Sequence, residues 1–270
     1  MSLLPAWSAA FESGVLAEVR ALPIADARDW AFGGSTGAGV KVAVIDSGID
    51  GDHPRVGGIA GGVAMVVDPD AEDGFRADEG PHEDLVGHGT ACAAIIKAMA
   101  PDAEIWSVRV LGPNLKGRGA LFYGGIGWAI DHGMHVANLS LSSKSEAMFG
   151  PLHEVADEAY FGNTVLVSAA NNSPGPTYPS QYASVVSVAA REGTDPMGLA
   201  YNPKPPVEFG ARGIDVDVAW ADRSSIVATG NSFAAPHVAG MVTLLLGKHP
   251  GLTPFQVKAV LQAVSENAVP

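Results

Sequence analysis

One serine of this chain lies where its hydroxyl could act as a nucleophile. Ser232 follows Gly230 by two positions and opens a run of small and apolar residues that is typical of a buried helix. Gly230 allows a sharp turn and leaves room for the backbone of another molecule. Pro236 fits the first turn of that helix, where its missing N–H has no partner to lose. The unpaired amides at the helix start would lie beside the hydroxyl and could stabilise an oxyanion, which makes Ser232 the candidate nucleophile.

A serine hydroxyl is a weak nucleophile and needs a base that a third group orients. Two upstream stretches supply such groups, VAVIDSGID at residues 42–50 and GHGTACA at residues 87–93. With GNSFAAPHVAG at residues 230–240, they resemble, in the same order along the chain, the aspartate, histidine and serine motifs of the subtilisin-like serine proteases (the subtilase family, peptidase S8). The resemblance covers most of the chain from about residue 40 onward and implies a triad of Asp46, His88 and Ser232.

The local sequence around Asp46 and His88 suits the roles that the resemblance implies. Asp46 ends an apolar run and precedes Ser47 and Gly48, so its carboxylate leaves the predicted sheet where it can accept a hydrogen bond from a histidine Nδ1. His88 lies between two glycines at a predicted helix start. The helix dipole would lower the pKa of His88 and Asp46 would raise it, toward the value that a general base needs. An aspartate that caps a turn is the alternative for Asp46.

Other titratable residues near the motifs are expected to have no catalytic part. Asp50 and Asp52 are predicted loop residues, and His237 is a packing residue in the family motif. Cys92 lies one helical turn after His88 and is expected to be a small buried residue. Some family members have a cysteine at the matching place, which implies sensitivity to mercurials without a catalytic role.

The stretch AANN at residues 169–172 resembles the AAGN of the family. The resemblance assigns the oxyanion-hole amide to Asn172 and puts Asn171 in place of the glycine. A side-chain amide and the Ser232 N–H, both aimed at the oxyanion, would stabilise a charge that the ground state lacks. Because two asparagines are adjacent, the assignment is ambiguous by one residue, and we favour Asn172.

Two further segments match places where the family binds an extended substrate through its backbone. They contain Gly117, Arg118, Gly119, Ser140, Leu141 and Ser142. An ordinary loop is the alternative for each segment. Many relatives have Ser-Leu-Gly-Gly where this chain has SLSS at residues 140–143, which leaves the preferred P1 residue open. The pair Tyr178-Pro179 matches a cis-proline of the family.

Two substitutions lie inside the nucleophile motif. Asn231 stands where the family has threonine, and Phe233 stands where it has methionine. Loss of an oxidisable thioether beside the nucleophile predicts activity that resists peroxide. Asn231 is expected to alter how the oxyanion is supported.

Composition limits the partners and cofactors of the chain. It has 270 residues, 47% of them hydrophobic, one cysteine and a formal net charge of −13. It can bury a large core and form no internal disulfide, and its charge disfavours nucleic acid and anionic membranes as partners. The acidic segment 68–84 lacks the pattern of a calcium loop and is expected to be solvated. The helix after His88 runs into Ala100 without the loop that holds calcium in many subtilisins, so we expect no metal and no cofactor.

The elements that must position these residues follow an α/β pattern. Continuous apolar runs predict strands at Val40–Ile45, Ile105–Leu111, Val136–Leu141, Thr164–Ala169 and Val185–Ala189. Helices are predicted to begin near His88, Ala120, Pro151, Ser232 and Pro254, the last capped by Thr253. Such strands suit a parallel sheet that helices cover on both faces, with sites at the carboxyl ends of the strands.

We therefore expect a single doubly wound α/β domain with a mostly parallel central sheet. Residues 40–270 would form the catalytic domain and residues 1–39 an N-terminal extension that packs on it, with a helical turn at residues 16–20. The first 20 residues lack a basic start followed by an apolar run, so neither a signal peptide nor a membrane span is predicted. A complete chain would then be cytoplasmic, whereas a trimmed catalytic domain would be secreted.

The expected activity is that of a serine endopeptidase with a polypeptide substrate, acting as a monomer. A dedicated peptide-maturation protease or macrocyclase is one alternative. A catalytically inactive binding module of the same fold is another.

Overall fold

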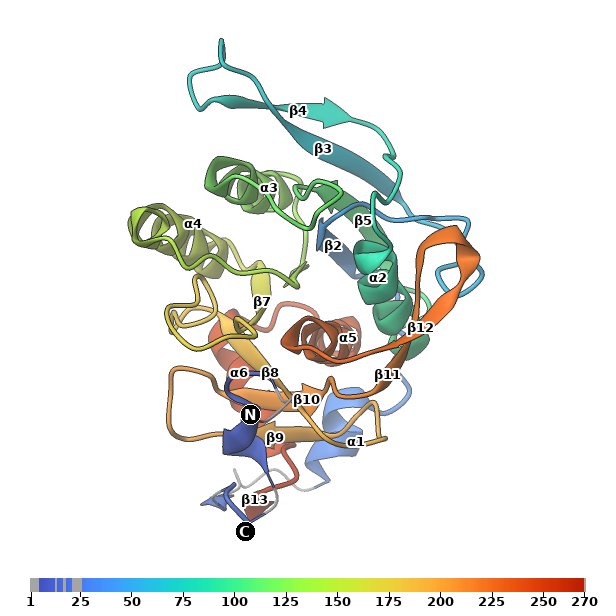
Figure 1. Cartoon of the computed structure of the whole chain (residues 1–270). Helices are drawn as coiled ribbons and strands as arrows, with labels where there is room; N and C mark the ends of the chain where they lie inside the picture. The colour runs from blue at the N-terminus through green and yellow to red at the C-terminus, as the bar shows by residue number, and fades with distance from the viewer. Residues whose placement is uncertain (1–4, 13, 17, 21–25, 270) are drawn as a thin grey trace.

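The structure, a computed structural model, describes residues 5–12, 14–16, 18–20 and 26–269. Among these residues, nine strands form one mostly parallel sheet in the order β4-β3-β5-β2-β6-β7-β8-β10-β9 (Figure 1). The seven strands from β3 to β10 in this order pair in parallel, and the edge strands β4 and β9 are antiparallel. The strands are β2 (Lys41–Asp46), β3 (Gly61–Val67), β4 (Phe75–Glu79), β5 (Glu104–Arg109), β6 (Val136–Leu139), β7 (Val165–Ala169), β8 (Val186–Arg191), β9 (Leu199–Tyr201) and β10 (Phe209–Arg212).

Strand β2 lies where the direction of winding changes. It pairs with β5 on one side and β6 on the other, and Ile45 is opposite both Val108 and Leu139. The chain places β3 and β5 on the first side and β6, β7 and β8 on the second. In open α/β sheets, ligands bind beside the carboxyl ends of the strands at such a switch point. Asp46 is the last residue of β2 and lies at this position.

Helices cover both faces of the sheet (Figure 1). Alternate residues of β2 divide between two cores, with Val42 and Val44 on one face and Ala43 and Ile45 on the other. The first core contains residues of α1 (Ala27–Phe32), α2 (His88–Met99), α5 (Asn231–Lys248) and α6 (Pro254–Ala263). The second contains residues of α3 (Gly119–Asp131) and α4 (Phe149–Phe161). The expected doubly wound α/β class is therefore confirmed.

Each strand and helix predicted from residue 40 onward is present, with starting points and ends that differ by at most two residues. Thr253 caps α6 as expected, in a reciprocal capping box with Gln256. The expectation for Pro236 was wrong, because it is the sixth residue of α5 and lies beyond the first turn. The helix tolerates it there because the Ser232 carbonyl, which an amide at position 236 would normally bind, accepts a hydrogen bond from Ser140 Oγ instead.

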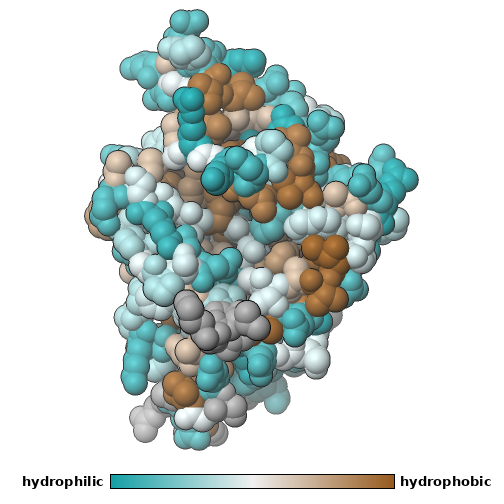
Figure 2. Space-filling view, viewed as in Figure 1, coloured by the Kyte–Doolittle hydropathy of each residue, from teal (hydrophilic) through white to brown (hydrophobic). Residues whose placement is uncertain are grey.

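Several strands were not predicted. β4 lies within the acidic segment that we expected to be a solvated loop. None of its residues is fully buried and three of its five are charged, so the sequence lacks the alternation of apolar and polar residues that would predict a strand. A second sheet pairs β11 (Val216–Ala219) with β12 (Ser225–Ala228). The space-filling view shows a mostly hydrophilic face with small separate hydrophobic patches, one of them near the β3–β4 hairpin at the top (Figure 2).

Several of the described N-terminal residues contact the body of the molecule. We expected a helical turn at residues 16–20, but Val19–Arg20 forms strand β1, which pairs in parallel with β13 (Ala268–Val269). The expectation was therefore wrong for these residues, and residue 17 lies outside the described residues. The short 3-10 helix η1 (Ser8–Phe11) buries Phe11. None of the helices among the described residues combines the length and apolarity needed to cross a bilayer.

Candidate active site

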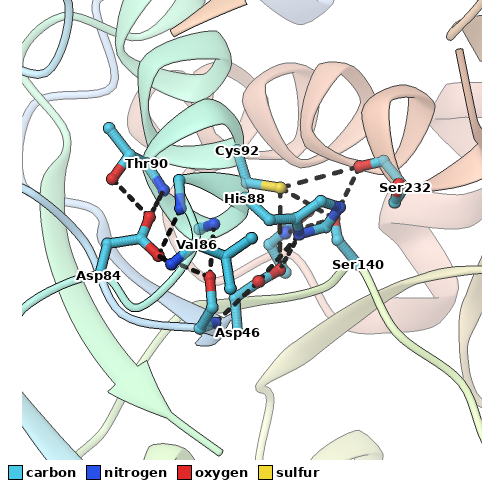
Figure 3. Close-up of polar contacts among 12 residues, drawn as sticks. Asp46, Asp84, Val86, His88, Thr90, Cys92, Ser140 and Ser232 are labelled. Carbon is cyan, nitrogen blue, oxygen red and sulfur yellow. Dashed lines mark hydrogen bonds and ion pairs between the residues drawn. The ribbon is translucent and has the colours of Figure 1, made fainter. Parts of the chain in front are cut away.

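Asp46 and His88 form a buried hydrogen-bonded pair at the carboxyl end of β2 (Figure 3). His88 Nδ1 lies 2.8 Å from Asp46 Oδ1 and 2.9 Å from Oδ2. The Ser47 N–H donates to the same carboxylate at 2.8 Å and fixes its orientation. Because Asp46 is completely buried and acts as the acceptor, Nδ1 carries the proton and Nε2 is left to accept one.

The surroundings of His88 tune its basicity. Burial alone would lower the pKa of His88, but the charge and hydrogen bond of Asp46, with a further contribution from the charge of Asp84, raise this pKa above its usual value. His237 is the contrast, because burial lowers the pKa of its imidazole to about 4. His237 Nδ1 is bound to the Phe233 carbonyl at 2.8 Å, which fits a neutral packing residue.

Asp84 organises the start of the helix that carries His88, and the sequence analysis missed it. We had assigned it to the solvated acidic segment. Its Oδ1 accepts from Val86 N, Gly87 N and Ser47 Oγ at 2.8–3.0 Å. Its Oδ2 accepts from Thr90 N at 2.8 Å and from Thr90 Oγ1 at 2.6 Å. The N-cap residue Gly87 makes no side-chain cap, so Asp84 supplies it.

The sequence after Asp84 contains a pattern that could have indicated its role as a helix cap. An aspartate often accepts a hydrogen bond from the backbone two residues later, in an Asx-turn. Asp84 is followed two residues later by Val86 and then by Gly87. Gly87 has a φ of 108°, a left-handed conformation that favours glycine. An aspartate followed by this turn and a helix start could have been interpreted as a cap.

Ser232 faces the same pocket as His88. This cavity, of about 420 Å³, is lined by both residues, Asn172, Trp220 and Phe233 among others. In Figure 3 the imidazole of His88 lies between the Asp46 carboxylate and Ser232. Ser232 is the second residue of α5, so its N–H is one of the amides that a helix leaves unpaired at its start. The structure thus brings the three side chains to one edge of the sheet.

Asn172 is the asparagine that faces Ser232, the candidate nucleophile. Its Oδ1 accepts from Asn231 N at 2.9 Å, which turns Nδ2 toward Gly230. A Cβ added to Gly230 would lie 3.3 Å from Ser232 Oγ and 3.5 Å from Asn172 Nδ2. Gly230 has an extended φ of 170°, so it is needed here for this space and not for a sharp turn. The side chain of Asn171 instead accepts from Ser173 N at 3.1 Å.

Ser140 lines the pocket of His88 and Ser232, and its side chain also contacts the protein interior. Its hydroxyl points inward, where it donates to the Ser232 carbonyl at 2.8 Å and accepts from Asn138 Nδ2 at 3.0 Å. Cys92 Sγ lies 3.2 Å from the same hydroxyl. The side chain of Ser140 therefore contacts the backbone of the candidate nucleophile.

Cys92 is a buried thiol beneath the Asp46–His88 pair. Burial, with a further contribution from the charge of Asp46, raises the pKa of Cys92 well above its ordinary value. The donor atoms of Asp46, His88 and Cys92 lie within 4.8 Å of one another, close enough for a metal ion. A metal would need a thiolate ligand and the removal of the proton on Nδ1, and the raised pKa and the Asp46 hydrogen bond oppose both.

The segments expected to bind substrate line a neighbouring pocket of about 320 Å³. Gly117, Arg118 and Gly119 form one wall of it, and Leu141 and Ser142 form another. Leu141 and Ser142 also line the pocket of His88 and Ser232, so the two hollows are adjacent. The Tyr178–Pro179 peptide is cis, as expected. Trp220, which the sequence analysis did not single out, lies edge-on to His88 with ring centroids 6.4 Å apart.

Comparisons with known proteins agree with this fold. Residues 37–268 match the model of the subtilase family, and the chain belongs to that family of serine proteases. It is 32% identical to subtilisin E of Bacillus subtilis (strain 168) in an alignment of 247 residues that covers 86% of this chain and 62% of the relative. It is 32% identical to a subtilisin of Bacillus pumilus over 86% of each chain. A crystal structure of a cold-adapted subtilisin-like serine proteinase superposes with a TM-score of 0.70 at 28% identity, covering 92% of this chain and 89% of that one.

The chain spans about 62% of the length of several curated relatives that it matches.

Proposed function

We propose that this chain is a serine endopeptidase that hydrolyses polypeptides through an acyl-enzyme. The observation that carries the proposal is the buried pair of His88 and Asp46, joined at 2.8 Å, in a pocket that Ser232 shares. A histidine that carries its proton on Nδ1 presents Nε2 as a base, and a neighbouring carboxylate stabilises the cation that forms. Residues 40–270 would form the catalytic domain.

In the proposed reaction, Ser232 Oγ attacks the peptide carbonyl while His88 Nε2 takes the hydroxyl proton. His88 then gives this proton to the leaving amine, and a water molecule hydrolyses the acyl-enzyme in a second cycle of proton transfer. Asp46 keeps the imidazole in the required tautomer. Asn172 Nδ2 and the Ser232 N–H would hold the oxyanion.

The substrate would be an extended polypeptide along the two adjacent pockets. Backbone hydrogen bonds to the segments 117–119 and 140–142 would give affinity, and the pockets would give selectivity.

Cleavage of a peptide library tests the proposal. The wild-type protein and Ser232→Ala are incubated with the library in parallel, and the products are identified by mass spectrometry. We expect cleavage within the peptides by the wild type and none by the variant. Cyclic or ligated products would instead indicate a macrocyclase, and equal cleavage by both proteins would contradict the assignment of Ser232.

A further inference from the structure

The side chain of Asn231, the residue before Ser232, uses all of its hydrogen-bonding groups. Its side chain is completely buried. Its Oδ1 accepts from Ala190 N at 2.8 Å, and its Nδ2 donates to the carbonyls of Ala6 and Ala170, each at 3.1 Å. Both N–H groups and the carbonyl of the carboxamide are thus used. The side chain ties β8 and the start of the 170–172 loop to the residue that precedes Ser232.

The N-terminal segment is part of the same network. Ala6 accepts from Asn231 Nδ2 through its carbonyl and donates through its N–H to the Asn172 carbonyl at 2.9 Å. Ala6 therefore bridges the backbone of the candidate oxyanion-hole residue and the side chain of Asn231. The Asn231 N–H also donates to Asn172 Oδ1 at 2.9 Å, so Ala6, Asn172 and Asn231 are all joined to one another by hydrogen bonds.

Phe11 anchors this segment. Its side chain is 4% exposed and packs in a small core with Ala170 and Ala189. Gly210 of β10 makes room for the ring, because a Cβ there would overlap it. Ala170 is both a packing partner of Phe11 and an acceptor for Asn231, so the anchor and the hydrogen-bond network meet at the loop that carries Asn172.

We propose that Asn231 and the N-terminal residues 5–11 are positioning elements of the oxyanion hole, which hold Asn172 Nδ2 against Ser232. This inference rests on the proposed peptidase function. The threonine that is usual at this place in the family motif has one hydroxyl donor and could not bind Ala6, Ala170 and Ala190 together. Asparagine at this position can therefore bind both the N-terminal segment, through the Ala6 carbonyl, and the 170–172 loop, through the Ala170 carbonyl.

Three variants test the inference by independent routes. Asn231→Thr removes the carboxamide, Phe11→Ala releases the anchor, and Ala6→Pro removes the N–H that binds Asn172. Removing an oxyanion donor costs about 10²- to 10³-fold in kcat, so a displaced donor should cost less, about 10-fold, with KM changed less than about twofold. A role in substrate binding would instead raise KM.

Two control variants separate positioning from general stability. Asn202 is also a buried asparagine whose Nδ2 donates to two carbonyls, those of Lys204 and Val207. Asn202→Thr should lower the melting temperature and leave kcat unchanged below that temperature. Phe255 is 67% exposed, so Phe255→Ala should change neither quantity.

A double-mutant cycle with Asn172→Ala decides the result. If Phe11→Ala and Asn231→Thr act through Asn172, each should lower kcat about 10-fold in the wild type and less than about twofold in the Asn172→Ala background. Equal losses in both backgrounds, or no loss in any of the three variants, would overturn the inference. Failure of the proposed function gives a different result, because the wild type itself would then cleave no peptide.

Discussion

The hydroxyl of Ser140 donates a hydrogen bond to the main-chain carbonyl of Ser232 at 2.8 Å. The carbonyl is available because Pro236, four residues later in α5, has no N–H to offer. The helix thus gives up one of its own hydrogen bonds near its start, and a residue from the loop after β6 replaces it. This contact fixes the candidate nucleophile relative to the sheet.

Ser140→Ala should lower both stability and turnover. Loss of the hydroxyl leaves the Ser232 carbonyl with only a long contact of 3.8 Å from Cys92 Sγ. This weaker pairing should cost about 1–3 kcal/mol of unfolding free energy, and it frees the start of α5 to shift, so kcat should fall several-fold. Chemical denaturation in the Ser232→Ala background avoids self-digestion, and kinetics are measured in the active protein. Ser168→Ala is the control, because Ser168 Oγ is buried without a hydrogen-bond partner among the described residues. Equal effects of the two substitutions would contradict the role of the contact.

Asp46→Asn should change both the rate and its pH dependence. The asparagine would disturb the tautomer of His88, and kcat should fall by about 10⁴. Because the neutral imidazole is the proposed base, activity of the wild type should be lost as the pH falls through the raised pKa of His88. Without Asp46 the burial that lowers this pKa dominates, so the acidic limb of the profile should move to lower pH. A profile of kcat/KM that keeps the same limb in both proteins would refute this account.

Asp84→Asn should weaken the start of α2 although Asp84 lies outside the pocket of His88 and Ser232. Five hydrogen bonds converge on this carboxylate, and hydrogen bonds to a charged group contribute about 1.5–3 kcal/mol. We expect a lower melting temperature together with a lower kcat, because His88 is the first residue of this helix. Glu83→Gln, which removes the exposed neighbouring charge, should leave both unchanged. An Asp84→Asn protein with wild-type stability would show that the cap contributes nothing.

Phe233→Met should create sensitivity to peroxide. Phe233 is 6% exposed, lines the pocket of Ser232 and lies 5.4 Å from the ring of His88. A methionine there would place an oxidisable thioether beside the nucleophile. Residual activity after peroxide treatment should remain high in the wild type and fall in the variant. A wild type that loses activity as fast as Phe233→Met would contradict the prediction.

Asp46, His88 and Ser232 were assigned through three motifs that resemble those of the subtilases, and the local sequence around each residue agrees with that assignment. The structure brings the three side chains to one edge of the sheet. Asp84 was missed because it ends an acidic segment that we interpreted as solvated, although the turn at Gly87 and the helix start at His88 could have indicated a cap. The contact between Ala6 and Asn231 joins residues 225 positions apart, and nothing local to either residue indicates it. Edge strands such as β4 were missed because solvent on one side removes the continuous apolar pattern of the central strands.

Labelling with a fluorophosphonate probe tests the central claim most directly. The probe reacts with a serine hydroxyl that a neighbouring base activates, and mass spectrometry of the digested protein locates the modified residue. The account predicts a single modification on Ser232, none in Ser232→Ala, and labelling slowed by several orders of magnitude in His88→Ala. Modification of another residue, or a rate that His88→Ala leaves unchanged, would contradict it.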